Sequence, residues 1–178
     1  MEIIIMSCDK YQNCWKPFFT LYNKYFPNKY KVHIVTETLD CKYANTIKVT
    51  GIWTERLRKA LEQIKSDNVL LMLDDFFIRS KVNIERIEYC ISQMNDDIAV
   101  FNFEKKYRNC DVSNLKGFER QFNNQVYLNS AQPSLWSKKA LLERLKDNKD
   151  IWQWETTKVN DKRICYINTE DFIIDVRI

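Results

Sequence analysis

Glycine, proline and histidine are scarce in this chain of 178 residues, which has two glycines, three prolines and one histidine. Because Gly51 and Gly117 stand far apart, the sequence contains neither the glycine-rich dinucleotide fingerprint nor the P-loop. A bound nucleoside diphosphate would therefore need a metal ion or basic side chains to balance its charge. Nucleophiles that depend on a histidine are poorly supported, since His33 lies inside a predicted strand, where we expect a structural role.

Long apolar runs and paired cysteines are missing as well. No segment reaches the roughly 18 consecutive apolar residues of a membrane helix, and Glu2 stands where a signal peptide carries basic residues. The six cysteines are scattered without a Cys-x-x-Cys motif, which favours reduced thiols over a zinc or disulfide framework. These features predict a cytoplasmic protein without a transmembrane segment.

The surplus of positive charge is small, because 28 basic side chains stand against 24 acidic ones. A net charge of +4, evenly spread, argues against nucleic-acid binding. It is compatible with an anionic small substrate or with weak peripheral contact at the inner face of a membrane. A hydrophobic content of 45% is ordinary for a globular protein, and we expect residues 1–178 to form one domain.

Short apolar runs alternate with helical patterns along the chain. Strands are predicted at residues 3–6, 30–36, 46–50, 69–73, 98–103, 163–168 and 172–176, with an extended segment at 127–136. Helices are predicted at residues 15–26, 54–64, 83–94 and 138–145. This alternation predicts an α/β fold with a mainly parallel central sheet and helices on both faces. Ligands bind such sheets beyond the carboxyl ends of the strands.

Several local features accompany these elements. Pro17 is predicted in the first turn of its helix, and Thr54 and Asn83 are predicted to cap the next two helices. The aromatic residues of the first helix recur on one face, which indicates core packing. Residues 105–124 are polar and irregular, so they are the best candidate for a long functional loop.

Two adjacent carboxylates, Asp74 and Asp75, follow the strongest buried-strand signal, at residues 69–73. They would emerge at the ligand-binding edge of the sheet, and the apolar residues 76–78 after them hold the pair between buried segments, where charges need a partner. Mg²⁺ and Mn²⁺ favour carboxylate oxygens together with substrate phosphates. The pair therefore predicts a metal site, and the alternative is a solvated turn with a helix-capping aspartate.

Further polar residues are candidates for the same edge. Arg56, at a strand-to-helix junction, could fork onto a phosphate or pair with Asp74; an exposed helical arginine is the alternative. Residues 132–136 and 152–155 place tryptophans beside amides and carboxylates. Sugar sites are often built in this way, because an aromatic ring offers an apolar face while polar groups bond hydroxyls. Buried core tryptophans are the alternative there.

Together these segments resemble small bacterial glycosyltransferases of the GT-A fold, the type associated with capsule, O-antigen and other surface polysaccharides. The resemblance covers roughly residues 3–155. Its motifs are Ser7-Cys8-Asp9-Lys10-Tyr11 with Trp15 and residues 17–19, then residues 53–57, 71–77 and 132–136. The aspartate pair in its apolar frame and the Gln-Pro-Ser-Leu-Trp stretch are the most specific of them.

The resemblance implies metal-assisted, inverting transfer of a sugar from a nucleoside-diphosphate sugar, such as a UDP-sugar, to a glycan or lipid-linked glycan acceptor. The donor would contact Ser7, Asp9, Tyr11, Trp53, Arg56 and Asp74. Mn²⁺ or Mg²⁺ would bind Asp75 and Asp74, with Asp75 as the direct ligand. The sugars would face Gln132, Trp136 and Trp154, and Glu155 would be the catalytic base.

The sequence also departs from the pattern of this family. The aspartate pair Asp74 and Asp75 stands in an Asp-Asp-Phe sequence rather than a strict Asp-x-Asp, and no C-terminal histidine offers a further metal ligand.

Two other classes of protein stay open. A metal-dependent nucleotidyl or phosphoryl transferase would also use paired acids at a strand edge, and would release a nucleoside monophosphate rather than a diphosphate. A non-catalytic module that binds nucleotide sugars or glycans would bind these ligands without turnover.

Overall fold

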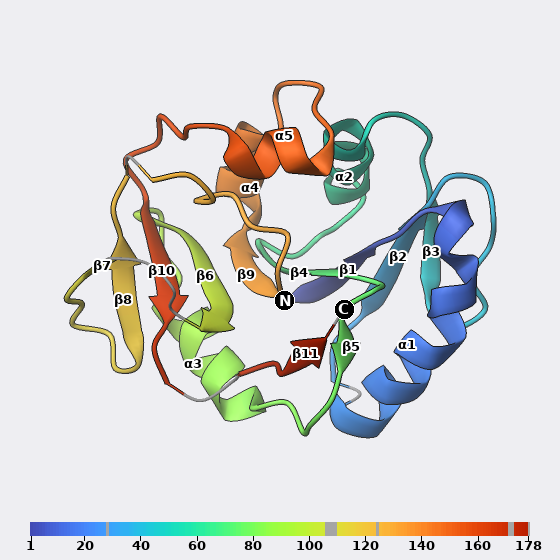
Figure 1. Cartoon of the computed structure of the whole chain (residues 1–178), viewed down its shortest axis with the longest axis horizontal. Coiled ribbons are helices and arrows are strands. Elements are labelled where there is room, and N and C mark those ends of the chain that lie inside the picture. Colours follow the sequence, from blue (N-terminus) through green and yellow to red (C-terminus); the bar gives the residue numbers. More distant parts are fainter. Residues whose placement is uncertain (28, 106–109, 124, 171–172, 178) are drawn as a thin grey trace.

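Strands and helices alternate in the computed structural model, which describes residues 1–27, 29–105, 110–123, 125–170 and 173–177 (Figure 1). The strands are β1 (Glu2–Met6), β2 (Val32–Thr36), β3 (Asn45–Lys48), β4 (Asn68–Leu73), β5 (Phe77–Ile78), β6 (Ile98–Lys105), β7 (Cys110–Asp111), β8 (Phe118–Gln121), β9 (Ser134–Ser137), β10 (Ile164–Asn168) and β11 (Val176–Arg177). The α-helices are α1 (Gln12–Tyr25), α2 (Trp53–Leu61), α3 (Ile84–Gln93), α4 (Lys138–Arg144) and α5 (Ile151–Thr156), and a 3-10 turn spans Asp9–Tyr11.

Nine strands form one sheet in the order β3-β2-β1-β4-β9-β6-β10-β8-β7. The strands β3, β2, β1 and β4 pair in parallel, and so do β6 and β10. Strand β9 is antiparallel to both of its neighbours, and β8 is antiparallel to β10 and β7. Seven strands therefore point one way and two, β8 and β9, point the other way. The predicted α/β fold with a mainly parallel sheet is confirmed.

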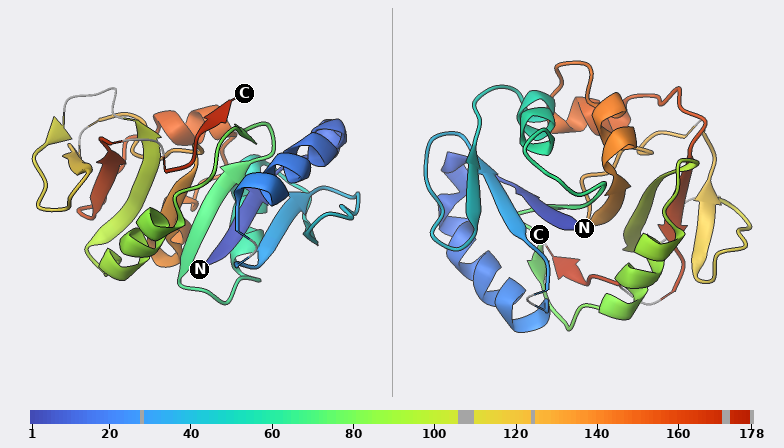
Figure 2. Two further views of the ribbon diagram at one scale, coloured as in Figure 1. Left: turned by 90° about the horizontal axis from the view of Figure 1, so that it is seen from below. Right: turned by 180° about the vertical axis from the view of Figure 1, so that it is seen from behind.

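Helices cover both faces of this sheet, as predicted (Figures 1 and 2). One face packs against α1 and α3, and its core is rich in aromatic rings such as Phe18 and Tyr22. The opposite face packs against α2, α4 and α5, with Leu57 and Leu141 among the buried residues. Because both faces are covered, the central strands read as continuous apolar runs, and residues 3–6 and 69–72 are at most 2% exposed.

A second, two-stranded sheet lies beside α1 and pairs β5 with β11 (Figure 1). Arg79 and Asp175 hold it together, since the Arg79 Nε atom donates to Asp175 Oδ1 at 3.1 Å and the two form an ion pair. A terminal strand was predicted at residues 172–176, but the structure has a strand only at Val176–Arg177. Residues 171–172 lie outside the described residues.

Two segments fold differently from their predictions. Part of residues 105–124, predicted as a long loop, forms strands, because β7 and β8 pair there and extend the sheet beside β10; residues 106–109 and 124 lie outside the described part of the chain. The sequence pattern of β8 does not resemble that of a buried strand, because only its two end residues are buried. Phe118 is 3% exposed and Gln121 is 1% exposed, and charged residues lie between them. Of residues 127–136, predicted as extended, only the part from Ser134 onward is a strand.

Two helix starts also differ. Helix α1 begins at Gln12, directly after the 3-10 turn, so Pro17 lies in its second turn and not in its first. Thr54 does not cap α2, because the helix begins one residue earlier and Thr54 is fully buried. Its hydroxyl lies 2.9 Å from the Asp147 carbonyl oxygen and accepts a hydrogen bond from the Lys149 N–H at 2.8 Å. Asn83 caps α3 as predicted.

Thr54 therefore ties α2 to the segment before α5, and this bond is testable. Thr54→Val keeps the shape but leaves the Lys149 N–H without its acceptor, so we expect a loss of about 1–3 kcal/mol in the free energy of unfolding. Urea denaturation measures it. The matched control is Thr20→Val, whose hydroxyl bonds a carbonyl on the exposed side of α1. Equal stability of the two variants would contradict this role for Thr54.

Candidate active site

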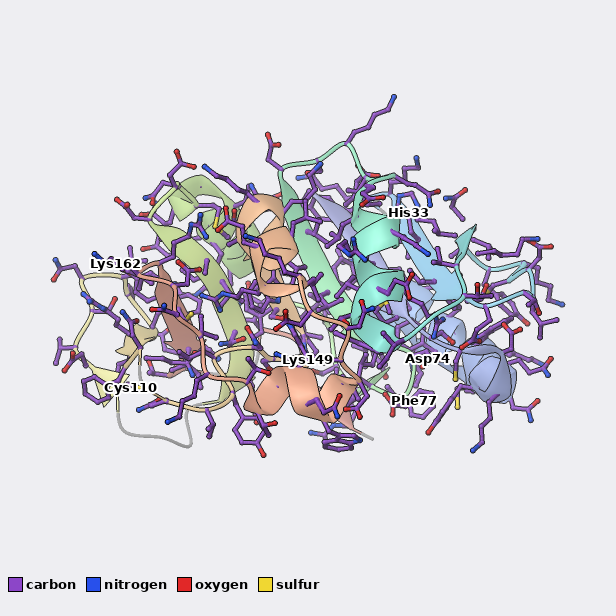
Figure 3. The ribbon with its side chains drawn as sticks, turned by 90° about the horizontal axis from the view of Figure 1, so that it is seen from above. His33, Asp74, Phe77, Cys110, Lys149 and Lys162 are labelled. Atoms are coloured by element: carbon purple, nitrogen blue, oxygen red, sulfur yellow. The ribbon has the colours of Figure 1, made fainter. Side chains whose placement is uncertain are left out.

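The carboxyl ends of β1 and β4 form the edge where Asp74 and Asp75 leave the sheet. The two strands run side by side in parallel register, with Met6 opposite Leu73, so Ser7 and Asp74 emerge together. Since β9 is antiparallel to β4, the segment before it, with Gln132, arrives at the same edge. In Figure 3 Asp74 and Phe77 lie at this edge, and His33 lies toward the other end of the strands.

Asp74 is a buried carboxylate, 5% exposed, whose partner is the hydroxyl of Ser7. Ser7 Oγ donates to Asp74 Oδ2 at 2.5 Å and accepts from the indole N–H of Trp15 at 2.7 Å. Burial raises the pKa of Asp74 to about 6; the Ser7 hydrogen bond opposes this rise, and the negative charge of Asp75 adds to it. Ser7 and Trp15 thus fix the orientation of this carboxylate.

Asp75 carries an oxygen that lacks a bonding partner. Its Oδ1 atom is buried and has no hydrogen-bond partner within the described residues, and burial raises the pKa of the carboxyl group. A buried, unpaired carboxylate oxygen beside a second carboxylate suits a divalent cation, which supplies the missing charge. The described residues contain no cluster of three or more metal-binding side chains, so phosphates and water would complete the coordination of such a cation.

A cavity of about 360 Å³ opens at this edge, and we call it the first cavity. Eight residues predicted for the site line it, namely Ser7, Tyr11, Trp53, Arg56, Asp74, Asp75, Gln132 and Glu155. They come from the segments that follow β1 and β4, the 3-10 turn, α2, α5 and the segment before β9, so the fold brings together positions that are up to 148 residues apart in the sequence. Their roles toward a ligand stay predictions.

Arg56 lines the first cavity, but its donors are already engaged. The side chain is 5% exposed and carries bonds on all three of its nitrogen atoms. Nε donates to the Val49 carbonyl at 3.0 Å, Nη2 to the carbonyls of Ser7 at 2.5 Å and Val35 at 3.3 Å, and Nη1 forms a 2.9 Å ion pair with Glu37. Arg56 thus joins the ends of three strands, which is a structural role, and its ion pair is with Glu37 and not with Asp74 as predicted. The predicted fork onto a phosphate stays a prediction.

This geometry predicts the effect of Arg56→Lys. Lysine keeps the charge but cannot reach these carbonyls with a planar fork, so we expect a loss of about 1–3 kcal/mol in the free energy of unfolding. Thermal unfolding measures the change, and Arg58→Lys on the same helix is the control. A variant with normal stability and weakened diphosphate binding would restore the phosphate role.

Asp9 lies outside the first cavity and holds a loop. Its carboxylate accepts hydrogen bonds from the backbone N–H groups of Glu37, Thr38 and Leu39 and from the Thr38 hydroxyl, at 2.6 to 3.3 Å. Desolvation raises the pKa of Asp9, but these bonds outweigh it and leave the pKa below its usual value. Asp9 therefore positions the loop after β2, and its predicted contact with a donor stays a prediction.

Trp136 and Trp154 belong to the core. They are 0% and 1% exposed and pack on each other with ring centroids 5.9 Å apart, so neither offers a surface to a sugar. Trp152, by contrast, is 73% exposed and lines the first cavity. Sequence spacing did not separate Trp152 from Trp154, because α5 is short and its buried face depends on contacts with Trp53.

Glu155 and Gln132 lie where the first cavity meets a second one. The second cavity measures about 210 Å³ and shares Gln132, Trp152 and Glu155 with the first. Glu155 Oε1 accepts the backbone N–H of Ala131 at 2.8 Å, so α5 and the segment before β9 are tied together at this point. The predicted base thus stands between two spaces that could hold two substrates.

Several lining residues were not predicted. Cys8 and Phe76 line the first cavity beside the aspartates; Cys8 follows Ser7 directly and Phe76 follows Asp75, so adjacency to the motifs was the available signal. Asn102 and Gln121 line the second cavity from β6 and β8. Gln121 lies in the segment that was predicted as a loop, and no sequence pattern identified Asn102 as a candidate site residue.

His33, predicted to be structural, is buried in β2 away from this edge (Figure 3). Its Nε2 atom lies 2.8 Å from Glu2 Oε2, and its Nδ1 atom lies 2.8 Å from Asn45 Nδ2. Both ring nitrogens are therefore engaged within the sheet.

Among the described helices, none has the length and apolar character needed to cross a membrane.

The fold has counterparts among solved structures, although no protein-family model and no curated protein matches the sequence. The bifunctional IspDF of Campylobacter jejuni aligns with a TM-score of 0.57 and 15% identity over 96% of this chain and 50% of that chain. S. aureus TarS 1–349 aligns with a TM-score of 0.54 and 14% identity over 95% of this chain and 60% of that one. TarS 1–349 in complex with UDP aligns with a TM-score of 0.53 and 14% identity over 96% of this chain and 61% of that chain.

These likenesses show the fold, which is of the GT-A type, as predicted. TarS 1–349 has also been solved with UDP-GlcNAc, and that structure aligns with a TM-score of 0.50 and 15% identity over 96% of this chain and 59% of the other. The present chain spans about half to three fifths of the length of these proteins.

Proposed function

We propose that the chain is a nucleotide-sugar-dependent glycosyltransferase, which moves a sugar from a UDP-sugar to a hydroxyl of a glycan or lipid-linked glycan in surface polysaccharide synthesis. The observation that carries this proposal is the first cavity, where a carboxylate pair with an unpaired oxygen faces Glu155 and Trp152. A fold shared with TarS, which has been solved with UDP and UDP-GlcNAc, supports it.

The charge of the first cavity supports a metal-dependent donor site. Arg56 is the basic side chain that lines it, and its nitrogen atoms are engaged by backbone carbonyls and Glu37. Among the described lining residues, a diphosphate would therefore meet two carboxylates without an unengaged basic side chain to offset them. Mn²⁺ or Mg²⁺, held by Asp75 and Asp74, would supply that charge and neutralise the leaving group.

The remaining roles follow from position. Ser7 and Trp15 orient the Asp74 carboxylate, and Tyr11 and Trp53 provide the aromatic wall where the nucleotide would lie. Glu155 would take the proton of the acceptor hydroxyl as that oxygen attacks the anomeric carbon. Attack from the side opposite the leaving diphosphate gives inversion, which agrees with a base at the boundary of the two cavities.

The proposal is tested by a thermal-shift screen of nucleotide sugars with and without Mn²⁺. We expect one UDP-sugar to raise the melting temperature with metal and to yield UDP when a suitable acceptor is added. Release of UMP would favour phosphoryl transfer of the sugar phosphate, and release of sugar 1-phosphate would favour nucleotidyl transfer. A thermal shift without any turnover would favour a binding module. The absence of a shift with every nucleotide sugar would overturn the proposal.

A further inference from the structure

One residue that lines the second cavity, Asn102, carries a buried hydrogen-bond acceptor for which the described residues supply no donor. Asn102, on β6, is 2% exposed, and its Nδ2 atom donates to Gln121 Oε1 at 2.7 Å. This bond fixes the amide, and in the described part of the chain Asn102 Oδ1 has no hydrogen-bond partner. A buried carbonyl oxygen without a donor is costly, so a ligand that brings an O–H or N–H group would satisfy it.

The charges around this cavity select the kind of ligand. Glu104 and Glu155 line it, and none of its described lining residues is a lysine or an arginine. Carboxylates repel phosphates and sulfates but accept hydrogen bonds from hydroxyl groups. With its described lining, the second cavity is therefore suited to an uncharged group with several hydrogen-bond donors.

The size and position of the second cavity further limit the kind of ligand that it can bind. Its volume of about 210 Å³ is below the lower end of ordinary ligand pockets, roughly 300 Å³, so it holds one part of a larger ligand. It joins the first cavity at Gln132, Trp152 and Glu155. The exposed indole of Trp152 supplies an apolar wall against which a ring can pack.

Building on the proposed function, we propose that the second cavity binds one uncharged sugar ring of the acceptor, with a ring hydroxyl or an amide N–H donating to Asn102 Oδ1 and Trp152 covering one face of the ring. The Asn102–Gln121 pair is then a specificity determinant for the acceptor. The ring is held next to Glu155, so the hydroxyl that reacts lies at the boundary with the donor.

The test uses methyl glycosides of glucose, galactose and N-acetylglucosamine, titrated without nucleotide and followed by ligand-observed NMR. We expect millimolar binding of at least one of them and no binding of methyl glucuronide or glucose 6-phosphate, which carry a negative charge. Asn102→Ala should weaken the binding by about 3- to 10-fold. The matched control is Asn129→Ala, because Asn129 is also buried with an unpaired Oδ1 but lines neither of the two cavities.

Trp152→Ala provides a second variant whose folding is not at risk, because the side chain is 73% exposed. We expect it to weaken the same glycoside by about 3- to 10-fold. The inference is overturned if no neutral glycoside binds, if the charged sugars bind equally well, or if Asn102→Ala and Asn129→Ala weaken binding to the same extent. UDP binding is titrated separately, so a protein that binds UDP but no glycoside refutes this inference alone. A protein that binds a glycoside but no nucleotide refutes the proposed function alone.

Discussion

Asp75→Asn is expected to remove the effect of Mn²⁺ on nucleoside diphosphate binding. If the carboxylate pair holds a metal as proposed, the metal offsets the repulsion between the diphosphate and the two carboxylates, and we expect UDP to bind roughly 100-fold more tightly with Mn²⁺ than with a chelator, a difference of about 3 kcal/mol. Asparagine keeps the shape of Asp75 but lacks the charge, and its buried Oδ1 position would bind a cation weakly. Calorimetry with and without metal measures both proteins.

The control for this experiment is Asp111→Asn, because Asp111 is exposed on β7 and lines neither cavity. It should keep the full difference between metal and chelator. If the wild-type protein binds UDP with the same affinity under both conditions, the carboxylate pair is not a metal site. The turn would then be a structural feature whose buried charges need another explanation.

Glu155→Gln is expected to lower the rate of sugar transfer by roughly 100-fold or more, since a general base contributes about that much. The amide oxygen of glutamine can still accept the N–H of Ala131, which Glu155 Oε1 now accepts at 2.8 Å, so the local structure should persist. The affinity for the donor should change little. Single-turnover kinetics with a UDP-sugar and the best acceptor glycoside separates the two effects.

Glu104→Gln is the matched control for Glu155→Gln. Glu104 is a second carboxylate that lines the second cavity, but it does not line the first. We expect this variant to affect the affinity for the acceptor more than the rate of transfer. The reverse pattern, with normal transfer by Glu155→Gln and slow transfer by Glu104→Gln, would assign the base to Glu104.

The fold could be predicted from the sequence because a sheet covered by helices on both faces requires strands of a recognisable composition. Strands buried on both faces must be apolar throughout, and residues 3–6 and 69–73 show this without ambiguity. Strand β8 was missed for the opposite reason. Near the edge of the sheet only Phe118 and Gln121 are buried, so the segment between them reads like a polar loop.

The candidate site was predictable where it follows a strand and unpredictable where it depends on contacts across the fold. Asp74 and Asp75 were found because they end a buried strand. The structural bonds of Arg56 were not predicted, because nothing in the sequence shows that the ends of three strands converge on it. Trp152 and Trp154 are two residues apart, and only the packing of Trp154 on Trp53 decides which of them faces solvent.

Strand β9 lies between two groups of strands in the sheet, because it pairs with β4 on one side and with β6 on the other. The first cavity lies where β4 ends and β9 begins, with Asp75 after β4 and Gln132 before β9 among its lining residues. A ligand that fills this cavity would contact both of these segments. By mass action it would stabilise the folded state by an amount set by its concentration and affinity, so the protection of β4 and β9 against local unfolding should rise with the concentration of the ligand.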